Sequence, residues 1–361
     1  MPPATAGAEL SVVSLVPVGR RWGAAIEAVD PAVRLTVAAG WFDDDIRAGW
    51  GDWTADSYLR PRPGGPVALP PREEREAALA GADVILAGFP VPVDLRARSP
   101  RLRWVHQTPA GASNLRRCDL WGSDVTVTTS RGLGNTLAIA EWVVAAFLHF
   151  ARQLHRAPAE AAAGRFDRFA YQPVLFAGKT VCVVGAGGIG QDVGRLCAAL
   201  GAARVVGTRR TPPPAGEPLP EGFAEIAGPE RLPELLADSA FVAVCAQWTP
   251  ETHGLIGAET LAAMPDGAVL ANVARGELID EDALAAHVDR LGGVALDVYV
   301  GEFEHAPPAW LWEHPRVLVT PHVSGGSDAA SQRPLDLFVD NLTAFVAGQP
   351  LRNIVDWSRG Y

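Results

Sequence analysis

Three ionisable residues in the second half of the chain each follow a short apolar segment: Arg275 in NVARGELIDEDAL, Glu302 in ALDVYVGE and His322 in VTPHVSGG. A guanidinium can bind a carboxylate through two parallel hydrogen bonds. An imidazole can give and take a proton near neutral pH, and a neighbouring carboxylate can orient it. Each residue alone has an ordinary structural explanation. Together they supply the parts of a site that binds an acid and moves a proton.

A glycine-rich segment earlier in the chain predicts a dinucleotide site. The sequence GAGGIG follows the apolar run TVCVV and begins a helical stretch that reaches about Leu200. Glycines allow a sharp turn there and let the backbone approach a pyrophosphate at the N-terminus of the helix. The motif alone is weak evidence, but the strand before it and the helix after it are the context that it requires. The predicted cofactor contacts are Gly185, Gly187, Gly188, Ile189 and Gly190.

The next apolar segment, ARVVGTRR, indicates which dinucleotide binds. It ends in Thr208, Arg209 and Arg210, where an NAD-specific site carries an aspartate or glutamate for the ribose hydroxyls. No carboxylate is there to repel a 2′-phosphate, and two guanidiniums can bind it. We therefore expect NADP(H) as the preferred cofactor and NAD(H) as the second. The alternative is that these arginines are solvated surface charges and that both cofactors bind.

The elements that must position these residues alternate between apolar strand-like runs and helical stretches. One series begins near Ser11, and a second follows a long apolar helix predicted at 135–153. This alternation is typical of parallel sheets with helical crossovers, and near-continuous Val, Ala and Leu runs are typical of strands covered on both faces. The predicted fold class is therefore α/β, with two doubly wound parallel sheets. Ligands bind beyond the carboxyl ends of such strands, which is where Arg275, Glu302 and His322 fall.

From Asn135 to Gly325 the chain resembles the D-isomer-specific 2-hydroxyacid dehydrogenase family. The resemblance rests on AIAEW, GKTVCVVGAGGIG, TPETHGLI, AMPDGAVLANVARGELIDEDAL, ALDVY followed by Glu302, and TPHVSGGS, which occur in this order. The C-terminal stretch LDLFVDNLTAFVAGQPLRNIVDWSRGY is also similar to the family, and the resemblance weakens only before about Ala82. The joint occurrence of these long motifs is far more specific than any one of them.

The resemblance implies two domains with the active-site cleft between them and hinge closure over the bound acid. A flavodoxin-like substrate domain would span 1–134 and include 328–361, which return to it. A Rossmann cofactor domain would span 135–327. The resemblance also implies a homodimer, which the apolar character of the predicted helix at 135–153 favours.

The resemblance further implies hydride transfer between a nicotinamide cofactor and C2 of a 2-oxo or 2-hydroxy acid. Arg275 would hold the substrate carboxylate and the C2 oxygen. His322 would act as general acid in reduction and as general base in oxidation, and Glu302 would orient the imidazole. Asp297 would lie near the nicotinamide. The remaining implied contacts are Gln247, Thr252 and Ala274 for the cofactor, and the backbone amides of Ala110 and Gly111 for the substrate.

Within the family, the reductases of glyoxylate and hydroxypyruvate look most similar, because of the Arg209–Arg210 pair and the Gln-Thr-x-Ala-Gly segment at 107–111. Bulkier 2-oxo acids stay open. We expect no regulatory domain after Tyr361, unlike in the long phosphoglycerate dehydrogenases. The alternative function is a nicotinamide-sensing binding protein, as in the C-terminal-binding corepressors, and an oxidant of formate or phosphite is a minor third possibility.

Three features depart from the family pattern. Gln247 and Trp248 replace a usual proline and a small residue, and Phe303 replaces a usual proline after Glu302. The stretch at 41–72 is longer than expected and has no clear period. We expect it to be peripheral, with Trp41, Trp50 and Trp53 as a satellite cluster or subunit contact; a substrate lid is the alternative.

Composition excludes several classes of protein. The 361 residues carry a formal net charge of −10, which provides no basic surface for nucleic acid. The longest apolar run contains Glu141 and is too short for a bilayer, and the N-terminus has no basic region of a secretory signal. The four cysteines form no CxxC pair, so we expect reduced thiols and no metal site. These features predict a cytoplasmic protein without nucleic-acid or membrane partners.

Overall fold

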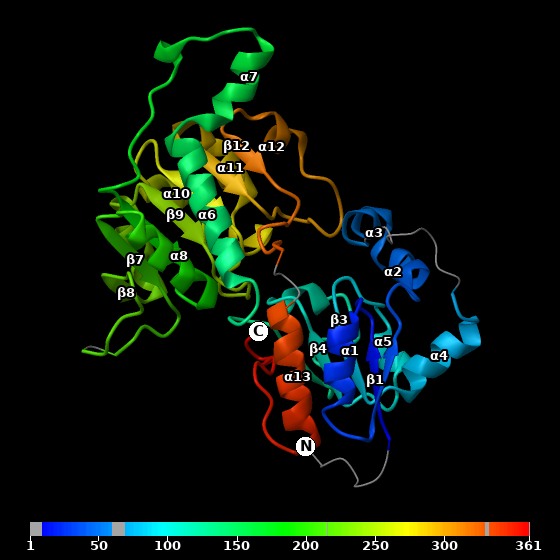
Figure 1. The fold of residues 1–361 in the computed structure, drawn as a ribbon. Coiled ribbons are helices and arrows are strands. Elements are labelled where there is room, and N and C mark those ends of the chain that lie inside the picture. Colours follow the sequence, from blue (N-terminus) through cyan, green and yellow to red (C-terminus); the bar gives the residue numbers. More distant parts are fainter. Residues whose placement is uncertain (1–8, 60–68, 215, 329–331, 361) are drawn as a thin grey trace. The chain divides into compact units, whose positions relative to one another are not determined.

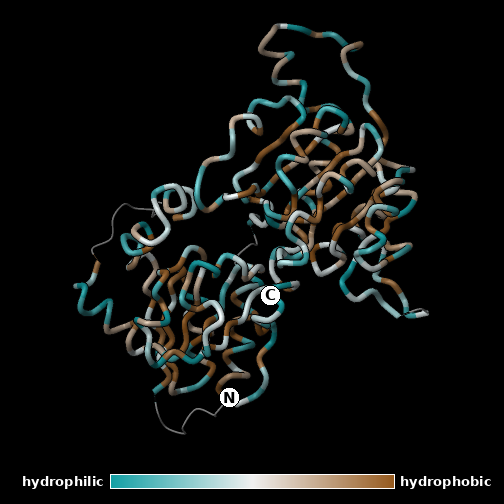
Figure 2. Tube along the Cα trace, turned by 180° about the vertical axis from the view of Figure 1, so that it is seen from behind, coloured by the Kyte–Doolittle hydropathy of each residue, from teal (hydrophilic) through white to brown (hydrophobic). Residues whose placement is uncertain are grey.

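The computed structural model describes residues 9–59, 69–214, 216–328 and 332–360. The chain forms two compact units, each with its own parallel sheet (Figure 1). Unit 1 comprises Met1–Gly134, Phe303–His305 and Ala329–Tyr361, and unit 2 comprises Asn135–Glu302 and Ala306–Asp328. Hydrophobic residues gather in the interior of each unit (Figure 2).

Unit 1 contains a five-stranded sheet in the order β2-β1-β3-β4-β5, and every neighbouring pair is parallel. This is the flavodoxin-like order. The strands are β1 (Leu10–Ser14), β2 (Val33–Val37), β3 (Val84–Ala87), β4 (Trp104–Gln107) and β5 (Thr126–Thr129). The helices are α1 (Arg20–Glu27), α2 (Asp43–Trp50), α3 (Asp52–Tyr58), α4 (Arg72–Gly81), α5 (Leu95–Arg98) and α13 (Gln332–Val346).

The C-terminal helix α13 packs against the centre of this sheet. All side chains of β3 and β4 are buried, as expected for strands covered on both faces. Trp104 of β4 stacks on Phe338 and Phe345 of α13, with ring centroids 5.2 and 5.4 Å apart. The end of the chain therefore belongs to the core of unit 1.

Unit 2 contains a seven-stranded parallel sheet in the order β12-β11-β10-β9-β6-β7-β8. The six strands β8-β7-β6-β9-β10-β11 have the Rossmann order. The seventh strand, β12, pairs with β11 and extends the sheet at that edge. The strands are β6 (Thr180–Val184), β7 (Arg204–Thr208), β8 (Glu225–Ala227), β9 (Phe241–Val244), β10 (Val269–Asn272), β11 (Gly293–Leu296) and β12 (Val317–Val319). The predicted fold class, two doubly wound parallel sheets, is confirmed.

The helices of unit 2 include the long apolar helix expected at 135–153, which forms as α6 (Thr136–Ala151). It packs against α8 and β10, and its residues Ala140, Val143, Phe147 and Phe150 are buried. The other helices are α7 (Ala157–Ala162), α8 (Gly188–Ala199), α9 (Leu232–Ala237), α10 (Ala258–Ala263), α11 (Glu281–His287) and α12 (Ala309–Glu313).

The stretch at 41–72 forms the short helices α2 and α3 and the start of α4, while residues 60–68 lie outside the described residues. The expected satellite cluster of tryptophans is not formed. Trp50 is buried in the main apolar core of unit 1, Trp41 packs against that core, and Trp53 is exposed. The sequence pattern missed these helices because each has at most eight residues, too few for a periodic signal.

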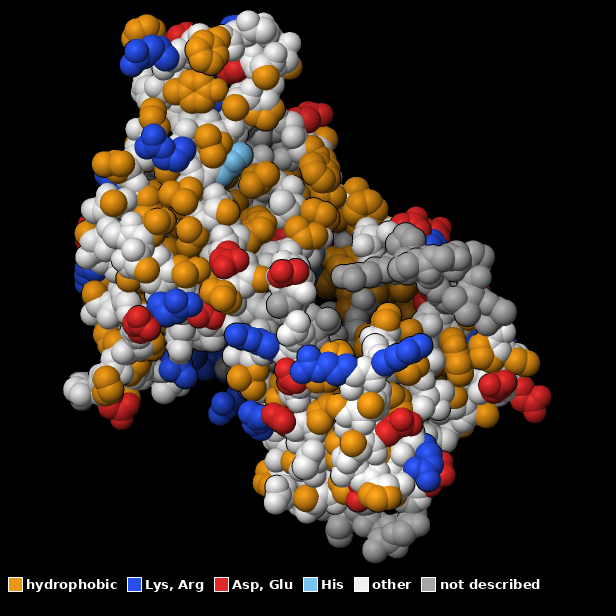
Figure 3. Space-filling model, viewed as in Figure 1, with side chains coloured by type: hydrophobic (Ala, Val, Ile, Leu, Met, Phe, Trp, Pro, Cys, Tyr) orange, Lys and Arg blue, Asp and Glu red, His pale blue; other side chains and the backbone are white. Residues whose placement is uncertain are grey.

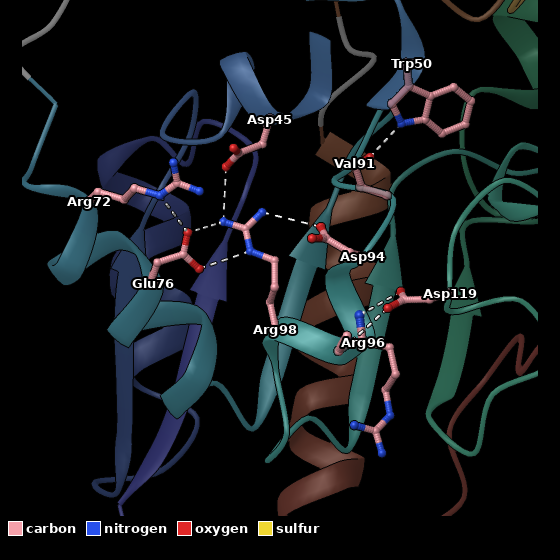
Figure 4. A network of polar contacts seen from close by, with 10 residues as sticks. Asp45, Trp50, Arg72, Glu76, Val91, Asp94, Arg96, Arg98 and Asp119 are labelled. Carbon is pink, nitrogen blue, oxygen red and sulfur yellow. Dashed lines mark hydrogen bonds and ion pairs between the residues drawn. The ribbon is translucent and has the colours of Figure 1, made fainter. Parts of the chain in front are cut away.

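Arg98 at the end of α5 anchors α2 and α4 to the rest of unit 1 (Figure 4). Its guanidinium lies 3.1 Å from the Asp45 carboxylate of α2 and 2.7 Å from the Glu76 carboxylate of α4. Trp50 adds a second attachment, because its Nε1 donates a hydrogen bond to the Val91 carbonyl at 2.7 Å. The α2–α3 segment is therefore attached to the rest of unit 1 through Asp45 and through Trp50.

All four cysteines are buried and unbridged. Burial raises the pKa of the Cys182 thiol to about 12, which disfavours the reactive thiolate. In the described ranges no single helix is long and apolar enough to cross a membrane, although α6 together with the bent segment Leu154–Ala162 meets that test by length and composition alone.

A buried histidine in unit 1 makes stability depend on pH. The His106 side chain is fully buried, and its Nδ1 lies 2.8 Å from the Thr128 hydroxyl. Burial lowers the pKa of His106 from 6.5 to about 4. The unfolded chain therefore takes up this proton at a higher pH than the folded chain, and stability is lost as the pH falls from 6.5 towards 4.

We expect His106→Gln to flatten this dependence. Between pH 7 and pH 5 the wild type should lose about 2 kcal/mol of unfolding free energy through this group, and the variant should not. Urea unfolding at both pH values measures the difference. The variant is also expected to be less stable at pH 7, so only the pH-dependent part is compared. An equal loss in both proteins would contradict the assignment.

Candidate active site

The three residues singled out for chemistry follow three adjacent strands of unit 2. Arg275 lies just beyond β10, Glu302 beyond β11 and His322 beyond β12, and these strands are neighbours in the sheet. Because the strands are parallel, all three residues leave the same edge of the sheet. The structure therefore brings together residues that the sequence separates.

Glu302 and His322 form a pair. The imidazole Nδ1 lies 3.2 Å from the Glu302 Oε1, and the two side chains are 28% and 4% exposed. The distance suits an ion pair with a protonated imidazole, although the ring is not aligned for a hydrogen bond in this conformation. A buried carboxylate beside a half-buried imidazole can orient the ring.

Asp297, at the end of β11, holds the turn that carries His322. Its buried carboxylate accepts hydrogen bonds from the Thr320 hydroxyl at 2.6 Å and from the Val323 and Ser324 amides at 2.8 and 2.9 Å. Its carbonyl accepts from the His322 amide at 2.9 Å. These bonds support a φ of 51° at His322, which is uncommon for a residue with a side chain. This contact was not foreseen, and the proximity of Asp297 to a nicotinamide stays a prediction.

Asn272 plays a similar part for Arg275, and sequence reasoning missed it. The Asn272 side chain is buried; its Nδ2 donates to the Arg275 carbonyl at 2.8 Å and its Oδ1 accepts from the Ala274 amide at 3.0 Å. The Arg275 guanidinium donates to the Ala274 carbonyl at 2.6 Å. A polar last residue in the otherwise apolar strand VLAN was the available signal.

A second acidic group, Glu277, lies close to this arrangement. Burial raises the pKa of Glu277 above its ordinary value, and the negative charge of Glu302 raises it further. The neighbouring Arg275 and backbone hydrogen bonds, one of them with Gly301, lower it. Glu277 therefore lies within electrostatic range of both Glu302 and Arg275.

The glycine-rich turn after β6 has the geometry of a dinucleotide site. Gly185 has a φ of 98°, and a Cβ there would lie 2.6 Å from the Ala246 backbone. A Cβ on Gly190 would lie 2.2 Å from the Gly185 carbonyl oxygen. Beside Gly187, by contrast, a Cβ would meet no atom within 4 Å. The backbone is thus tightly packed on its protein side and open at the position where a pyrophosphate would approach.

The amides of α8 complete this arrangement. In the described part of the chain, no backbone acceptor takes the N–H groups of Gly188, Ile189 and Gly190, as is usual for the first turn of a helix. Such amides, together with the helix dipole, stabilise an anion. The residues present therefore fit the diphosphate of a dinucleotide.

At the end of β7, Thr208 is buried and its carbonyl accepts hydrogen bonds from the Gly185 and Ala186 amides at 3.1 and 2.8 Å. The next residue, Arg209, is exposed. Arg210 is also exposed and lies 3.4 Å from the Glu251 carboxylate. The Thr208 carbonyl thus fixes the glycine-rich turn. The two guanidiniums differ in their surroundings, because Arg210 faces the Glu251 carboxylate and Arg209 does not.

The loop after β9 is organised by Thr252. Its hydroxyl accepts from the Thr249 amide at 2.8 Å and donates to the Gln247 carbonyl at 2.7 Å. Trp248 packs partly against the core of unit 2, and its Nε1 lies 3.3 Å from the His253 Nδ1. The Thr252 side chain therefore shapes the backbone at Gln247, which is a structural role whether or not a cofactor touches it.

In unit 1, the loop after β4 carries the proposed substrate amides. The Gln107 side chain donates to the Gly111 carbonyl and to the Asn114 side chain, both at 3.0 Å. No acceptor among the described residues takes the amide hydrogens of Ala110 or Gly111. These two amides are therefore able to bind an anion.

Comparison with known proteins gives consistent results. The family model described as "D-isomer specific 2-hydroxyacid dehydrogenase, NAD binding domain" matches residues 144–324. A D-3-phosphoglycerate dehydrogenase from Mycobacterium bovis is 32% identical over 305 residues, which cover 81% of this chain and 54% of that protein. A glyoxylate reductase from Thermococcus gammatolerans is 31% identical over 269 residues, covering 70% of this chain and 75% of that protein.

Among solved structures, a D-isomer specific 2-hydroxyacid dehydrogenase from Xanthobacter autotrophicus Py2, in complex with NADPH and MES, is similar with a TM-score of 0.72. It is 31% identical, and the match covers 98% of this chain and all of that one. The chain spans about half the length of the phosphoglycerate dehydrogenases that it matches.

Proposed function

This chain belongs to the D-isomer specific 2-hydroxyacid dehydrogenase family, and from that premise we propose that it transfers a hydride between NADP(H) or NAD(H) and C2 of a small 2-oxo or 2-hydroxy acid. One observation carries the proposal: Arg275 and the Glu302–His322 pair leave three adjacent parallel strands at the same edge of a sheet with a dinucleotide turn. We assign the cofactor to a domain at 135–327, and the substrate amides to one at 1–134 that includes 328–361.

In the proposed reduction, a bound nicotinamide supplies the hydride, and the protein supplies orientation and the proton. Arg275 binds the substrate carboxylate through paired hydrogen bonds and orients the C2 oxygen. Glu302 faces the Nδ1 of His322, so the other ring nitrogen gives its proton to the forming alkoxide. In oxidation the neutral imidazole takes that proton back. Asp297 keeps the histidine turn in place through both steps.

Steady-state oxidation of NADPH and NADH, in parallel with glyoxylate, hydroxypyruvate, pyruvate and bulkier 2-oxo acids, tests this function. We propose glyoxylate and hydroxypyruvate as the best substrates, since a relative that is 31% identical is a glyoxylate reductase. We expect turnover with the higher kcat/KM for NADPH. If NADPH binds but no acid is reduced, the activity is wrong and a nicotinamide-sensing binding protein describes the chain better.

The cofactor preference is expected to depend on Arg209. Arg209→Ser should weaken NADPH binding on the order of tenfold, because a hydrogen bond to a charged group is lost, and should leave the NADH Kd nearly unchanged. Arg210→Ser is the matched variant and should have a smaller effect, since Arg210 already faces Glu251. Fluorescence titration gives the Kd of NADPH and the Kd of NADH for each variant, and each value is compared with that of the wild type. Equal losses for NADPH and NADH would mean that Arg209 does not contact the 2′-phosphate.

We also propose a homodimer, and the segment between α6 and β6 supports it. This segment carries large apolar side chains on its surface, at Leu154, Phe166, Phe169, Val174 and Leu175. Figure 3 shows hydrophobic side chains exposed where α7 lies at the top of the view. Exposed apolar surface of this kind marks an interaction site, and a second copy of the chain would cover it.

A double substitution in this segment is expected to separate the subunits. Phe166→Ser with Phe169→Ser should convert a dimeric mass into a monomeric one in light scattering at micromolar concentration, because two large apolar contacts are removed. Trp312→Ser, on the exposed surface of α12, is the control and should leave the mass unchanged. A monomeric wild type would refute the dimer.

A further inference from the structure

The polypeptide leaves unit 2 directly after Glu302 and returns to it at Ala306. The intervening residues, Phe303–His305, belong to unit 1. Phe303 is thus bonded to the residue whose carboxylate faces His322, yet its own side chain packs in unit 1. Whatever holds Phe303 therefore also restrains the main chain of Glu302.

Phe303 lies in a cluster of four aromatic residues. Its ring centroid is 4.6 Å from that of Phe89, 5.6 Å from that of Tyr58 and 6.3 Å from that of Trp50. The rings meet in tilted or edge-to-face arrangements, which are the favourable ones for aromatic pairs. Three contacts of this kind give one preferred position to the Phe303 side chain.

The main chain of Phe303 is held as well. The buried Thr54 hydroxyl on α3 donates a hydrogen bond to the Phe303 carbonyl at 2.5 Å. The Glu302 amide in turn donates to the Tyr299 carbonyl at 3.3 Å. The backbone is therefore fixed both at Glu302 itself and at the residue that follows it.

The helices that make these contacts are attached to each other and to the rest of unit 1. Trp50 is buried and bonded to the Val91 carbonyl, and Arg98 joins α2 to α5. Arg47 of α2 lies 2.7 Å from both Asp52 and Asp56 of α3, which ties the two helices together. The buried Trp50 and the Arg98–Asp45 pair are the contacts that connect this support to the rest of unit 1.

We infer that Phe303 is a positioning residue, and that its packing against Trp50, Tyr58 and Phe89 fixes the backbone at Glu302 so that the carboxylate stays against His322. This inference rests on the proposed function, because it concerns the proton step. It assigns a role to two features that depart from the family pattern, the phenylalanine after Glu302 and the α2–α3 segment.

A double-mutant cycle tests the inference. Phe303→Ala should lower kcat for 2-oxo acid reduction on the order of tenfold, as for a small displacement of a catalytic group, while the NADPH Kd stays the same. Phe303→Leu should restore most of the rate because it refills the cluster. In the Glu302→Gln background, Phe303→Ala should change kcat less than about twofold, since the carboxylate through which it acts is gone. Trp312→Ala is the control and should have no effect in either background.

The outcomes separate this inference from the proposed function. Equal loss of kcat in both backgrounds, or no loss in the wild-type background, overturns the inference alone. If Phe303→Ala does not fold, Thr54→Val completes the same cycle with a smaller change, because it removes the hydrogen bond to the Phe303 carbonyl. A wild type that reduces no 2-oxo acid overturns both the proposed function and the inference.

Discussion

Replacing His322 with asparagine is expected to lower kcat for 2-oxo acid reduction by about 10²- to 10⁴-fold, the usual contribution of general acid catalysis. Asparagine is the suitable replacement because it tolerates the left-handed φ of 51° at this position. The turn held by Asp297 is then kept, and only the proton donor is removed. Steady-state kinetics with saturating NADPH measures the loss.

Two controls show whether the loss is chemical. The NADPH Kd of His322→Asn should stay within about twofold of the wild type, since the proton donor is not part of the diphosphate site. His314→Ala removes a histidine at the other end of β12, where its Nε2 lies 3.3 Å from Asp289, and should leave kcat unchanged. A comparable loss in His314→Ala, or a kcat in His322→Asn close to that of the wild type, would contradict the assignment.

The strand, glycine turn and helix of the candidate cofactor site could be predicted from the sequence because their signal is local. The apolar run TVCVV, the glycines and the helix after them are contiguous, so the strand, the turn and the helix N-terminus follow from one short segment. The same holds for the strand ends that carry Arg275, Glu302 and His322. Their proximity needed one further rule, that parallel strands end at a common edge, and the strand order in the sheet satisfies it.

The supporting contacts could not be predicted because they join distant segments. The structural role of Asp297 is evident only from its partners, the Val323 and Ser324 amides, which lie 26 and 27 residues further along the chain. Nothing in ALDVY indicates those partners. The bond between Thr54 and Phe303 spans 249 residues. The α2–α3 helices are too short to show a period, so only the tertiary structure reveals that Trp50 is part of the core.

Replacing Arg275 with lysine is expected to lower kcat/KM for a 2-oxo acid by roughly 10- to 150-fold, which corresponds to the loss of one hydrogen bond to a charged group. Lysine keeps the positive charge but cannot offer the planar pair of donors that matches a carboxylate. Part of the change should appear in KM, because the guanidinium binds the carboxylate, which does not react, and part in kcat, because it also orients the C2 oxygen. Arg231→Lys, at an exposed ion pair with Glu234, is the control and should leave both constants unchanged.

A comparison of pyruvate with its amide identifies the group that Arg275 binds. The wild type should strongly prefer the acid, because a neutral carboxamide offers the guanidinium one acceptor and no charge. In Arg275→Lys this preference should shrink by about the factor by which kcat/KM for pyruvate falls, since the two changes remove the same interaction. If the preference persists undiminished, another cation or the amides of Ala110 and Gly111 bind the carboxylate. The role of Arg275 would then be limited to the C2 oxygen.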